Sequence, residues 1–251
     1  MYDRLINRRA LVAAFALFVA ATVPSFAADP APAAAPPTKT LQWLRAEDVE
    51  PGQLLPPPAA AASPEQQADL AALRDVIRTR TPERYAQAKW DDEHEDASIF
   101  AATIGDGFNL SALPATAELL KLVQHEQSVA ANMAKRYFLR PRPWAVDTTI
   151  VACDFKLGKP PLTSYPSGHA TLGYSVGFVL AALIPEKAQA IQARAKDYAY
   201  SREVCGAHYH SDTEASHALG VAVATRLLTL PALQSRIEAA RRELRTARLT
   251  G

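Results

Sequence analysis

Apolar residues recur at the three- and four-residue spacing of amphipathic helices through most of the chain beyond residue 60. This spacing predicts helices over residues 115–138, 168–184, 186–204, 211–230 and 232–245. The stretch 168–184 is apolar nearly all round, a pattern typical of a buried central helix. Runs of β-branched residues are short, and no hairpin turn with flanking strand patterns occurs. The chain is therefore predicted to form one all-α domain over residues 40–251.

Local signals extend this prediction toward the N-terminal half. Ser63 has the features of an N-cap, because a proline follows it and Gln66 completes a capping box. Thr81, again followed by proline, predicts the start of another helix. Residues 51–58 end in three prolines and favour an extended, polyproline-like conformation. The acidic run 91–96 is predicted to form a solvated helix face.

The N-terminus has the pattern of a secretory signal peptide over residues 1–27. Three arginines precede a 14-residue apolar stretch at 10–23, and Ser-Phe-Ala at 25–27 fits the cleavage site. The alternative is an uncleaved anchor, but a spanning helix needs about 20 apolar residues. Residues 28–39, rich in alanine and proline, are predicted to be disordered. We therefore expect a periplasmic or secreted protein with no stable membrane insertion after cleavage.

Composition places the chain among ordinary globular proteins. It has 251 residues, of which 49% are hydrophobic, and a net charge of +1. Without residues 1–27, 24 basic and 25 acidic residues remain, so the net charge becomes −1. This balance gives no indication of a general affinity for nucleic acid.

The two cysteines, Cys153 and Cys205, would meet an oxidising compartment in an exported chain. We expect them to form a disulfide, and the alternative is two buried thiols. No Cys-x-x-Cys spacing occurs, and two cysteines alone make a poor metal site.

Candidate chemistry lies in three short segments, of which the first contains two fixed cations. Lys135 lies at the end of the predicted helix 115–138, and Arg142 follows seven residues later, immediately before Pro143. Two cations near the C-terminal end of a helix can simply interact favourably with the negative end of the helix dipole. That interpretation gives no reason for the rigid Arg-Pro-Arg-Pro run in which Arg142 lies.

The second segment, Pro166–His169, opens the buried helix. A helix N-terminus offers unpaired N–H groups and a partial positive charge, which suit a phosphate oxygen. Gly168 allows the backbone to approach a ligand closely. The alternative is an ordinary Ser167 N-cap with a packed histidine. However, a titratable ring at His169 is costly in an apolar helix unless it has a partner or a role.

The third segment, Ser201–Asp212, is the most specific. Arg202 lies near the end of one predicted helix, and His208 and Asp212 are four residues apart. A carboxylate that holds one imidazole nitrogen leaves the other free to attack. The alternative is an i, i+4 surface pair of little consequence.

Together the three segments resemble the signature of the PAP2 superfamily of phosphatases and vanadium haloperoxidases. More narrowly, the chain is similar to the bacterial class A non-specific acid phosphatases over most of its length after the signal peptide. Outside the histidine and cation positions, the resemblance includes Leu54–Pro58, Tyr165 and the run Cys205–His208. It implies a compact helical bundle and an acid phosphatase domain at 40–251.

The resemblance also implies roles for individual residues. His208 would be the nucleophile that forms a phosphohistidine, Asp212 would orient it, and His169 would be the general acid. Three cations would clamp the phosphate oxygens, and two further groups would donate hydrogen bonds to them. The cations are Lys135, Arg142 and Arg202, and the further groups are the Ser167 hydroxyl and the Gly168 amide.

No cofactor is expected. His208, His210 and Asp212 could be drawn as metal ligands, but zinc sites need three or four ligands in suitable geometry. The three cations would also repel a metal ion there. A metal site would, in addition, leave the presence of these cations unexplained. One departure from the family pattern follows the third segment, where many relatives carry a small residue and then Arg but this chain has Ser216 and His217. This departure leaves substrate preference open.

The leading hypothesis is a secreted, metal-independent acid phosphatase with an acidic optimum and phosphotransferase activity toward alcohols. Its partners would be small phosphorylated substrates, with assembly into a homo-oligomer left open. Three alternatives remain at this point. They are a vanadate-dependent haloperoxidase, a membrane lipid phosphatase of the same superfamily, and a periplasmic phosphate-binding helical protein without catalysis.

Overall fold

Helices account for the architecture of the residues that the computed structural model describes, which are 39–153, 155 and 160–251. The longer helices are α2 (Pro64–Thr79), α3 (Pro82–Glu93), α5 (Pro114–Phe138), α7 (Gly168–Leu183), α8 (Ala188–Val204), α9 (His210–Thr229) and α10 (Gln234–Thr246). One-turn helices are α1 (Pro51–Leu54), α4 (Ala101–Ile104) and α6 (Pro143–Val146). Short 3-10 turns lie at Ala46–Val49, Ala97–Phe100, Pro185–Lys187 and Pro231–Leu233. The all-α prediction is confirmed.

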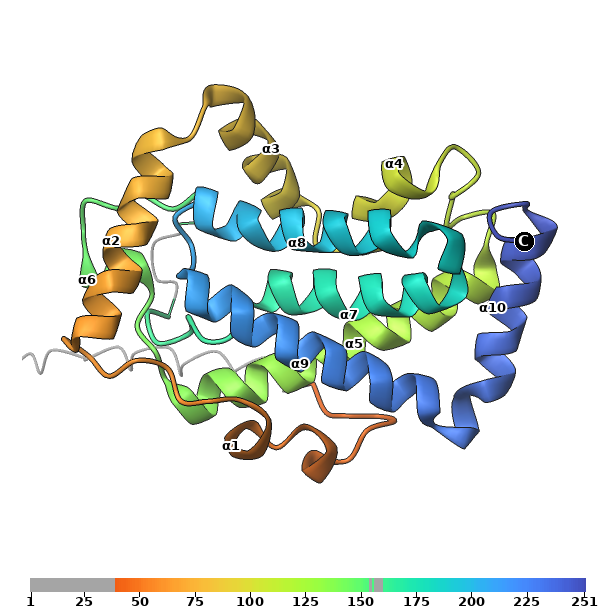
Figure 1. Ribbon diagram of the computed structural model, residues 1–251. Helices are drawn as coiled ribbons and strands as arrows, with labels where there is room; N and C mark the ends of the chain where they lie inside the picture. Colours follow the sequence, from red (N-terminus) through yellow and green to blue (C-terminus); the bar gives the residue numbers. More distant parts are fainter. Residues whose placement is uncertain (1–38, 154, 156–159) are drawn as a thin grey trace, which may run out of the picture. The chain divides into compact units, whose positions relative to one another are not determined.

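Helix α7 forms the centre of the bundle, as its apolar sequence predicts. It packs most extensively on α8 and α9, which run antiparallel to one another beside it, and also on α5 (Figure 1). The α7–α9 contact is close because Gly220 has no side chain. A Cβ at Gly220 would lie 2.8 Å from Tyr174 Cβ and 3.0 Å from the Ser175 nitrogen. Backbone therefore meets backbone along this contact.

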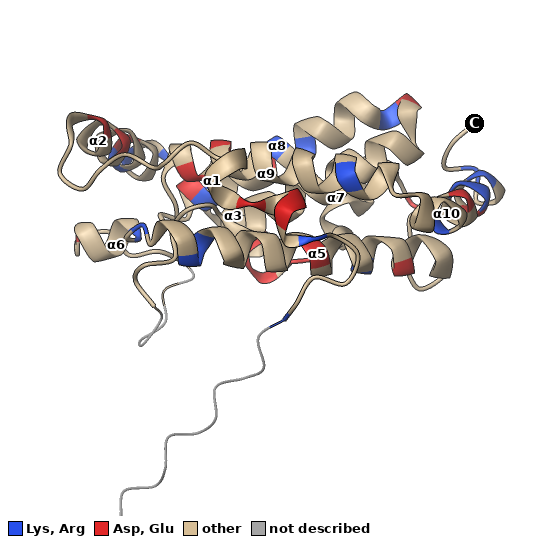
Figure 2. Cartoon of the chain, turned by 90° about the horizontal axis from the view of Figure 1, so that it is seen from below, with Lys and Arg blue, Asp and Glu red and all other residues tan. Residues whose placement is uncertain are grey.

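Four helix ends meet at one end of the bundle. Helices α5 and α8 end there, and α7 and α9 begin there, at the left of Figure 1. Helix α2 lies against the same end and packs on α8 and α9. The C-terminus lies beside α10 at the opposite end. Residues of both charge signs are scattered along the helices when the described chain is viewed from below (Figure 2).

The predicted N-caps are confirmed, with one correction. The hydroxyls of Ser63 and Thr81 each accept a hydrogen bond from the backbone three residues on. The expected capping box at Gln66 is wrong, because its side-chain oxygen accepts from Arg140 instead. The expected extended stretch at 51–58 is also only partly right. Pro51–Leu54 is a one-turn helix, consistent with the suitability of proline for a first helical position.

The acidic run 91–96 is a solvated face only in part, because Glu93, Glu95 and Asp96 are exposed but Asp91 and Asp92 are not. Asp91 is fully buried and pairs with Arg194 and with the hydroxyl of Ser201. Asp92 is also mostly covered and pairs with Arg202. The reason is that α3 packs on α8, whose basic residues lie more than 100 positions later in the chain.

The predicted signal peptide at 1–27 and all but the last residue of the segment 28–39 lie outside the described residues. Among the helices that are described, no single one has both the length and the apolar composition of a membrane span. Helices α9 and α10 meet those criteria only as a pair bent by 74°.

Candidate active site

His208 lies in the short connection between α8 and α9, at the end of the bundle where four helix ends meet. The chain turns at Gly206, whose φ of 71° is the left-handed conformation that glycine adopts without steric cost. The turn is tight as well, because a Cβ on Gly206 would lie 3.1 Å from an Ile150 methyl carbon. This turn brings His208 back into the protein, where it is 1% exposed.

The hydrogen bonds of His208 fix the protonation of its ring. Its Nε2 lies 2.8 Å from Nη1 of Arg142, and its Nδ1 lies 3.3 Å from Oδ2 of Asp212. A guanidinium can only donate, so Nε2 must accept with its lone pair. The proton of the neutral ring is then on Nδ1, where it faces the Asp212 carboxylate. This tautomer presents a basic Nε2 beside a cation.

Asp212 is fully buried and is held on both oxygens. Its Oδ2 accepts from the Ser164 hydroxyl at 2.6 Å and from the Tyr209 amide at 3.0 Å. Its Oδ1 accepts from Arg140 at 2.7 Å. A buried carboxylate needs such donors to remain charged. Asp212 is therefore oriented independently of His208, as expected for a group that positions the ring.

Arg140 is the buried counter-charge of this carboxylate, and the sequence did not identify it. It also pairs with Asp69 at 2.8 Å and Gln66 at 2.7 Å on α2, and its guanidinium lies 4.2 Å from the Tyr209 ring centre. Burial opposes the charge of Arg140, but the nearby Asp212 and Asp69 carboxylates outweigh burial and raise its pKa. Arg140 thus ties α2 to the start of α9.

Three cations approach the histidines from different parts of the chain. Besides His208, Arg142 contacts the Ala207 carbonyl at 2.9 Å. The Ala207 amide in turn donates to the Arg202 carbonyl at 3.0 Å, so the side chain of Arg142 contacts the turn that follows Arg202. Lys135 approaches from the end of α5, and its Nζ is 3.2 Å from the position of a Cβ on Gly168. Glycine at 168 therefore leaves room for this ammonium group.

His169 lies between two acceptors at the start of α7. Its Nε2 is 3.2 Å from the Asp92 carbonyl oxygen, and its Nδ1 is 3.5 Å from a carboxylate oxygen of Glu95. Each nitrogen of the His169 ring therefore faces an acceptor. The Asp92 side chain also accepts a hydrogen bond from Arg202 at 2.5 Å. Asp92 and Glu95 were missed in the sequence because both belong to the run interpreted as solvent-exposed.

The start of α7 has the cap expected of it. The Ser167 hydroxyl accepts from the Ala170 amide at 3.3 Å, and the Ser167 amide donates to the Ser216 hydroxyl at 2.9 Å. Ser216 in turn contacts the Asp212 carbonyl oxygen at 2.7 Å. The starts of α7 and α9 are therefore joined by side chains, and His169 and His208 are carried on a connected frame.

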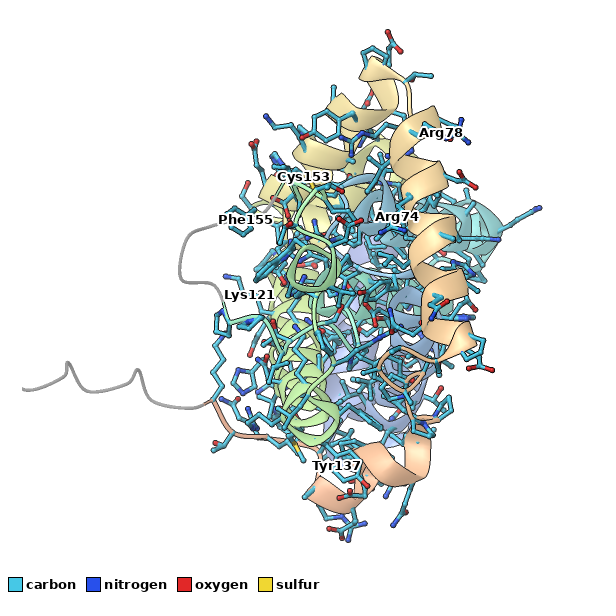
Figure 3. All side chains as sticks on the ribbon, turned by 90° about the vertical axis from the view of Figure 1, so that its left-hand side faces the viewer. Arg74, Arg78, Lys121, Tyr137, Cys153 and Phe155 are labelled. Carbon is cyan, nitrogen blue, oxygen red and sulfur yellow. A yellow bond between two sulfur atoms is a disulfide. The ribbon has the colours of Figure 1, made fainter. Side chains whose placement is uncertain are left out.

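The cysteines form the disulfide that we expected. Cys153 and Cys205 have Cα atoms 5.2 Å apart, and the Cys153 amide donates to the Cys205 carbonyl at 3.0 Å. Cys205 precedes His208 by three residues, so the bond fixes one side of the turn that carries the ring. Figure 3 shows Cys153 at the end of the bundle beside α2, which carries Arg74 and Arg78.

Two other histidines near the third segment, His210 and His217, have other partners. His210 pairs with Glu203 at 3.1 Å, and its side chain is 61% exposed. Burial acts to lower the pKa of His210, but the hydrogen bond and charge of Glu203 raise it above its usual value. His217 packs against the Tyr174 ring. Within the described residues, no three His, Cys, Asp or Glu side chains are grouped to hold a metal ion.

Comparison with known proteins gives one consistent relationship. Residues 119–236, which contain all three segments, match the PAP2 superfamily. Over 201 residues the chain is 34% identical to an acid phosphatase of Zymomonas mobilis, covering 77% of this chain and 75% of that protein. It is 32% identical over 197 residues to a non-specific acid phosphatase of Salmonella typhimurium, covering 76% and 78%. A non-specific acid phosphatase of Providencia stuartii is 29% identical, with 76% and 79% covered.

Proposed function

The chain belongs to the PAP2 superfamily and is an enzyme of the acid phosphatase class, and we propose that it hydrolyses phosphate monoesters through a phosphohistidine on His208. The observation that carries this proposal is the state of the His208 ring. The Nδ1–H group of His208 faces the accepting carboxylate of Asp212, and Arg142 donates to the lone pair on Nε2. A bound phosphate would take over the donors of Arg142, so Nε2 would then be free to attack phosphorus.

The reaction would proceed in two displacements. In the first, the Nε2 lone pair of His208 forms a bond to phosphorus while the bond to the ester oxygen breaks. His169 gives its proton to that oxygen, and the alcohol leaves. In the second, water attacks the phosphohistidine, its proton passes to His169, and the P–N bond electrons return to Nε2. Phosphate leaves with His208 neutral and His169 protonated, as at the start.

Charge stabilisation would come from the cations around the two histidines. Phosphoryl transfer depends mainly on positioning and on neutralising the three equatorial oxygens. Lys135, Arg142 and Arg202 would clamp these oxygens, with hydrogen bonds from the Ser167 hydroxyl and the Gly168 amide. By analogy with oxyanion holes, each donor is worth about 10²–10³ in rate. Three fixed cations supply the charge, so the proposed reaction needs no metal ion.

The two histidines require opposite protonation, and this sets the expected pH dependence. The first step needs a protonated His169 and a neutral His208, which favours an acidic optimum. Because the intermediate is covalent, added alcohols should compete with water and receive the phosphoryl group. We further propose a periplasmic or secreted enzyme, consistent with the N-terminal sequence and the disulfide.

The test is the release of p-nitrophenol from p-nitrophenyl phosphate in the presence of EDTA by the wild type and by His208→Ala. The wild type should retain full activity, and His208→Ala should lose at least about 10³-fold if it is the nucleophile. Wild type quenched in alkaline detergent should carry one phosphoryl group on histidine that is stable to alkali and released by acid. Undiminished turnover by His208→Ala would refute the assignment. Bromide oxidation after vanadate loading, without phosphatase activity, would indicate a haloperoxidase instead.

A further inference from the structure

A polar pocket of about 380 Å³ lies beside the candidate active site, between α5, α7 and the first described residues of the chain. Its walls carry charged and amide side chains rather than the apolar groups usual in ligand pockets. The polar residues that line it include Lys39, Glu95, Lys121, Gln124, Gln127 and Ser128.

The pocket and the candidate phosphate site share a wall. Glu95 lines the pocket, and one of its carboxylate oxygens is 3.5 Å from Nδ1 of His169. The same oxygen is 3.9 Å from the position of a Cβ on Gly168. Leu172, one helical turn beyond Gly168, lines the pocket as well. A leaving group that receives its proton from His169 would therefore lie at the near end of this pocket.

The far end of the pocket is basic, and two separate segments of the chain contribute its lysines. Buried Glu126 accepts from the amides of Gln42 and Leu44, at 2.8 and 2.9 Å, which fastens this segment to α5. The fastening brings Lys39 to the same pocket as Lys121 of α5. Figure 3 shows Lys121 on the side of the molecule at which the described chain begins. Two ammonium groups in one pocket favour an anion.

The middle of the pocket offers an acceptor for a hydroxyl group. Gln127 is only 2% exposed, and its side-chain oxygen has no hydrogen-bond partner within the described part of the chain. Leaving a buried polar atom unpaired is unfavourable, so such atoms are normally satisfied. Gln124 and Ser128 lie on the same stretch of α5 and line the pocket with it. This region therefore suits a polyhydroxylated ligand.

The length of α5 sets the size of that ligand. Lys121 and Lys135 are 14 residues apart on one helix, which corresponds to roughly 21 Å along the axis. Side chains on a helix lean toward its N-terminus, so Lys121 leans away from Lys135 and the two charges remain well separated. A sugar with a phosphate at each end is closer to this separation than the much shorter diphosphate.

We propose that this pocket binds the leaving group, and that Lys39 and Lys121 select phosphate esters whose sugar carries a second, distal phosphate. This proposal rests on the proposed function and names its substrate class. The carboxylate of Glu95 at the near end disfavours an anion next to the transferred phosphate. Sugar bisphosphates are therefore preferred over diphosphates and over sugar monophosphates.

The test compares KM for fructose 1,6-bisphosphate, fructose 6-phosphate, inorganic pyrophosphate and p-nitrophenyl phosphate. The wild type should show its lowest KM with the bisphosphate. The variant Lys39→Gln with Lys121→Gln should raise that KM about tenfold or more, because each charge-assisted contact is worth more than 1 kcal/mol. KM for p-nitrophenyl phosphate should stay within about twofold. Lys89→Gln with Lys196→Gln, which changes two exposed lysines outside the pocket, is the matched control for charge.

A second variant tests the middle of the pocket without changing charge. Gln127→Leu should raise KM for both fructose esters and leave p-nitrophenyl phosphate unchanged. Equal KM for the mono- and bisphosphate in the wild type would overturn the proposal, as would equal effects of the lysine changes on all four substrates. Failure of the proposed function itself would look different, because the wild type would then release no phosphate from any of these substrates.

Discussion

Replacing Arg140 with Met should destabilise the protein more than any other single change to an ion pair in the described chain. Met keeps a similar length and volume but removes the charge and all the donors. Two carboxylates, Asp69 and Asp212, would then face the vacated position without a counter-charge. Asp212 is fully buried and Asp69 mostly so, so water can stabilise neither of them well.

The magnitude follows from this burial. Removing one partner of a buried ion pair typically costs about 3–5 kcal/mol, because an uncompensated charge stays behind. The hydrogen bonds to Gln66 and Ser211, both at 2.7 Å, are lost as well, which places Arg140→Met in the upper part of that range. For a domain of this size each kcal/mol lowers Tm by about 2–4 °C, so a fall of roughly 10–20 °C is expected.

Thermal and urea unfolding followed by circular dichroism would measure this change at neutral pH. The matched control is Arg74→Met, which removes an ion pair with Asp147 whose arginine is 56% exposed. Exposed pairs are worth about 0–1 kcal/mol, so the control should move Tm little. In the Arg140→Met background, Asp69→Asn should recover part of the loss, since one stranded carboxylate becomes neutral. Equal Tm values for the two arginine variants would refute the reasoning, and so would strictly additive effects of Arg140→Met and Asp69→Asn.

Three further predictions concern packing, the disulfide and pH. Gly220→Ala should cost about 1–3 kcal/mol in urea unfolding, because its methyl group would meet α7 at 2.8 Å. Replacing both Cys153 and Cys205 with Ala should cost about 2–4 kcal/mol, since the bond joins residues 52 apart, and reduction of the wild type should reproduce the loss. His210→Gln should destabilise more at about pH 5.5 than at about pH 8.5 in thermal melts. Glu203 raises the pKa of His210, so the stability that His210 contributes is present below its usual pKa and lost as pH rises through the raised value.

Each of these predictions has a contradicting result. Gly52→Ala should cost less than Gly220→Ala, because its methyl would meet only the movable end of the Tyr137 side chain. An equal cost would show that α7 and α9 can move apart to make room for the methyl group at position 220. Cysteine replacement without change in unfolding would show that the disulfide does not constrain the unfolded chain. A destabilisation by His210→Gln that grows with pH would mean that the pKa of His210 is lowered in the folded protein.

Much of the fold was readable from local patterns, because helices depend on neighbours three and four residues apart. The start of α7 is an example, since Ser167 caps it and the apolar run after it is buried as predicted. The grouping of His208 with Asp212 was readable for the same reason, since one turn of chain and the start of α9 bring them together. The pairing of Arg142 with His208 came instead from the family resemblance, because these residues are 66 positions apart.

What the sequence did not reveal depends on partners that are distant in the chain. Asp91 and Asp92 look like solvated charges until α8 supplies Arg194 and Arg202. Gln66 looks like half of a capping box until Arg140 competes for it. In each case a local pattern suggests one partner or solvent, and an arginine distant in the chain supplies the partner instead. Such pairs were outside the reach of periodicity and spacing.

The placement of the last residue far from the histidines has a practical consequence. Gly251 lies at the end of the bundle opposite the cluster of helix ends, where its amide donates to Glu186 at 2.8 Å. A linker attached there could anchor the protein to a bead or electrode with its reactive end facing the solution. Immobilised in this orientation, the protein would present the end of the bundle that carries the histidines to soluble reactants.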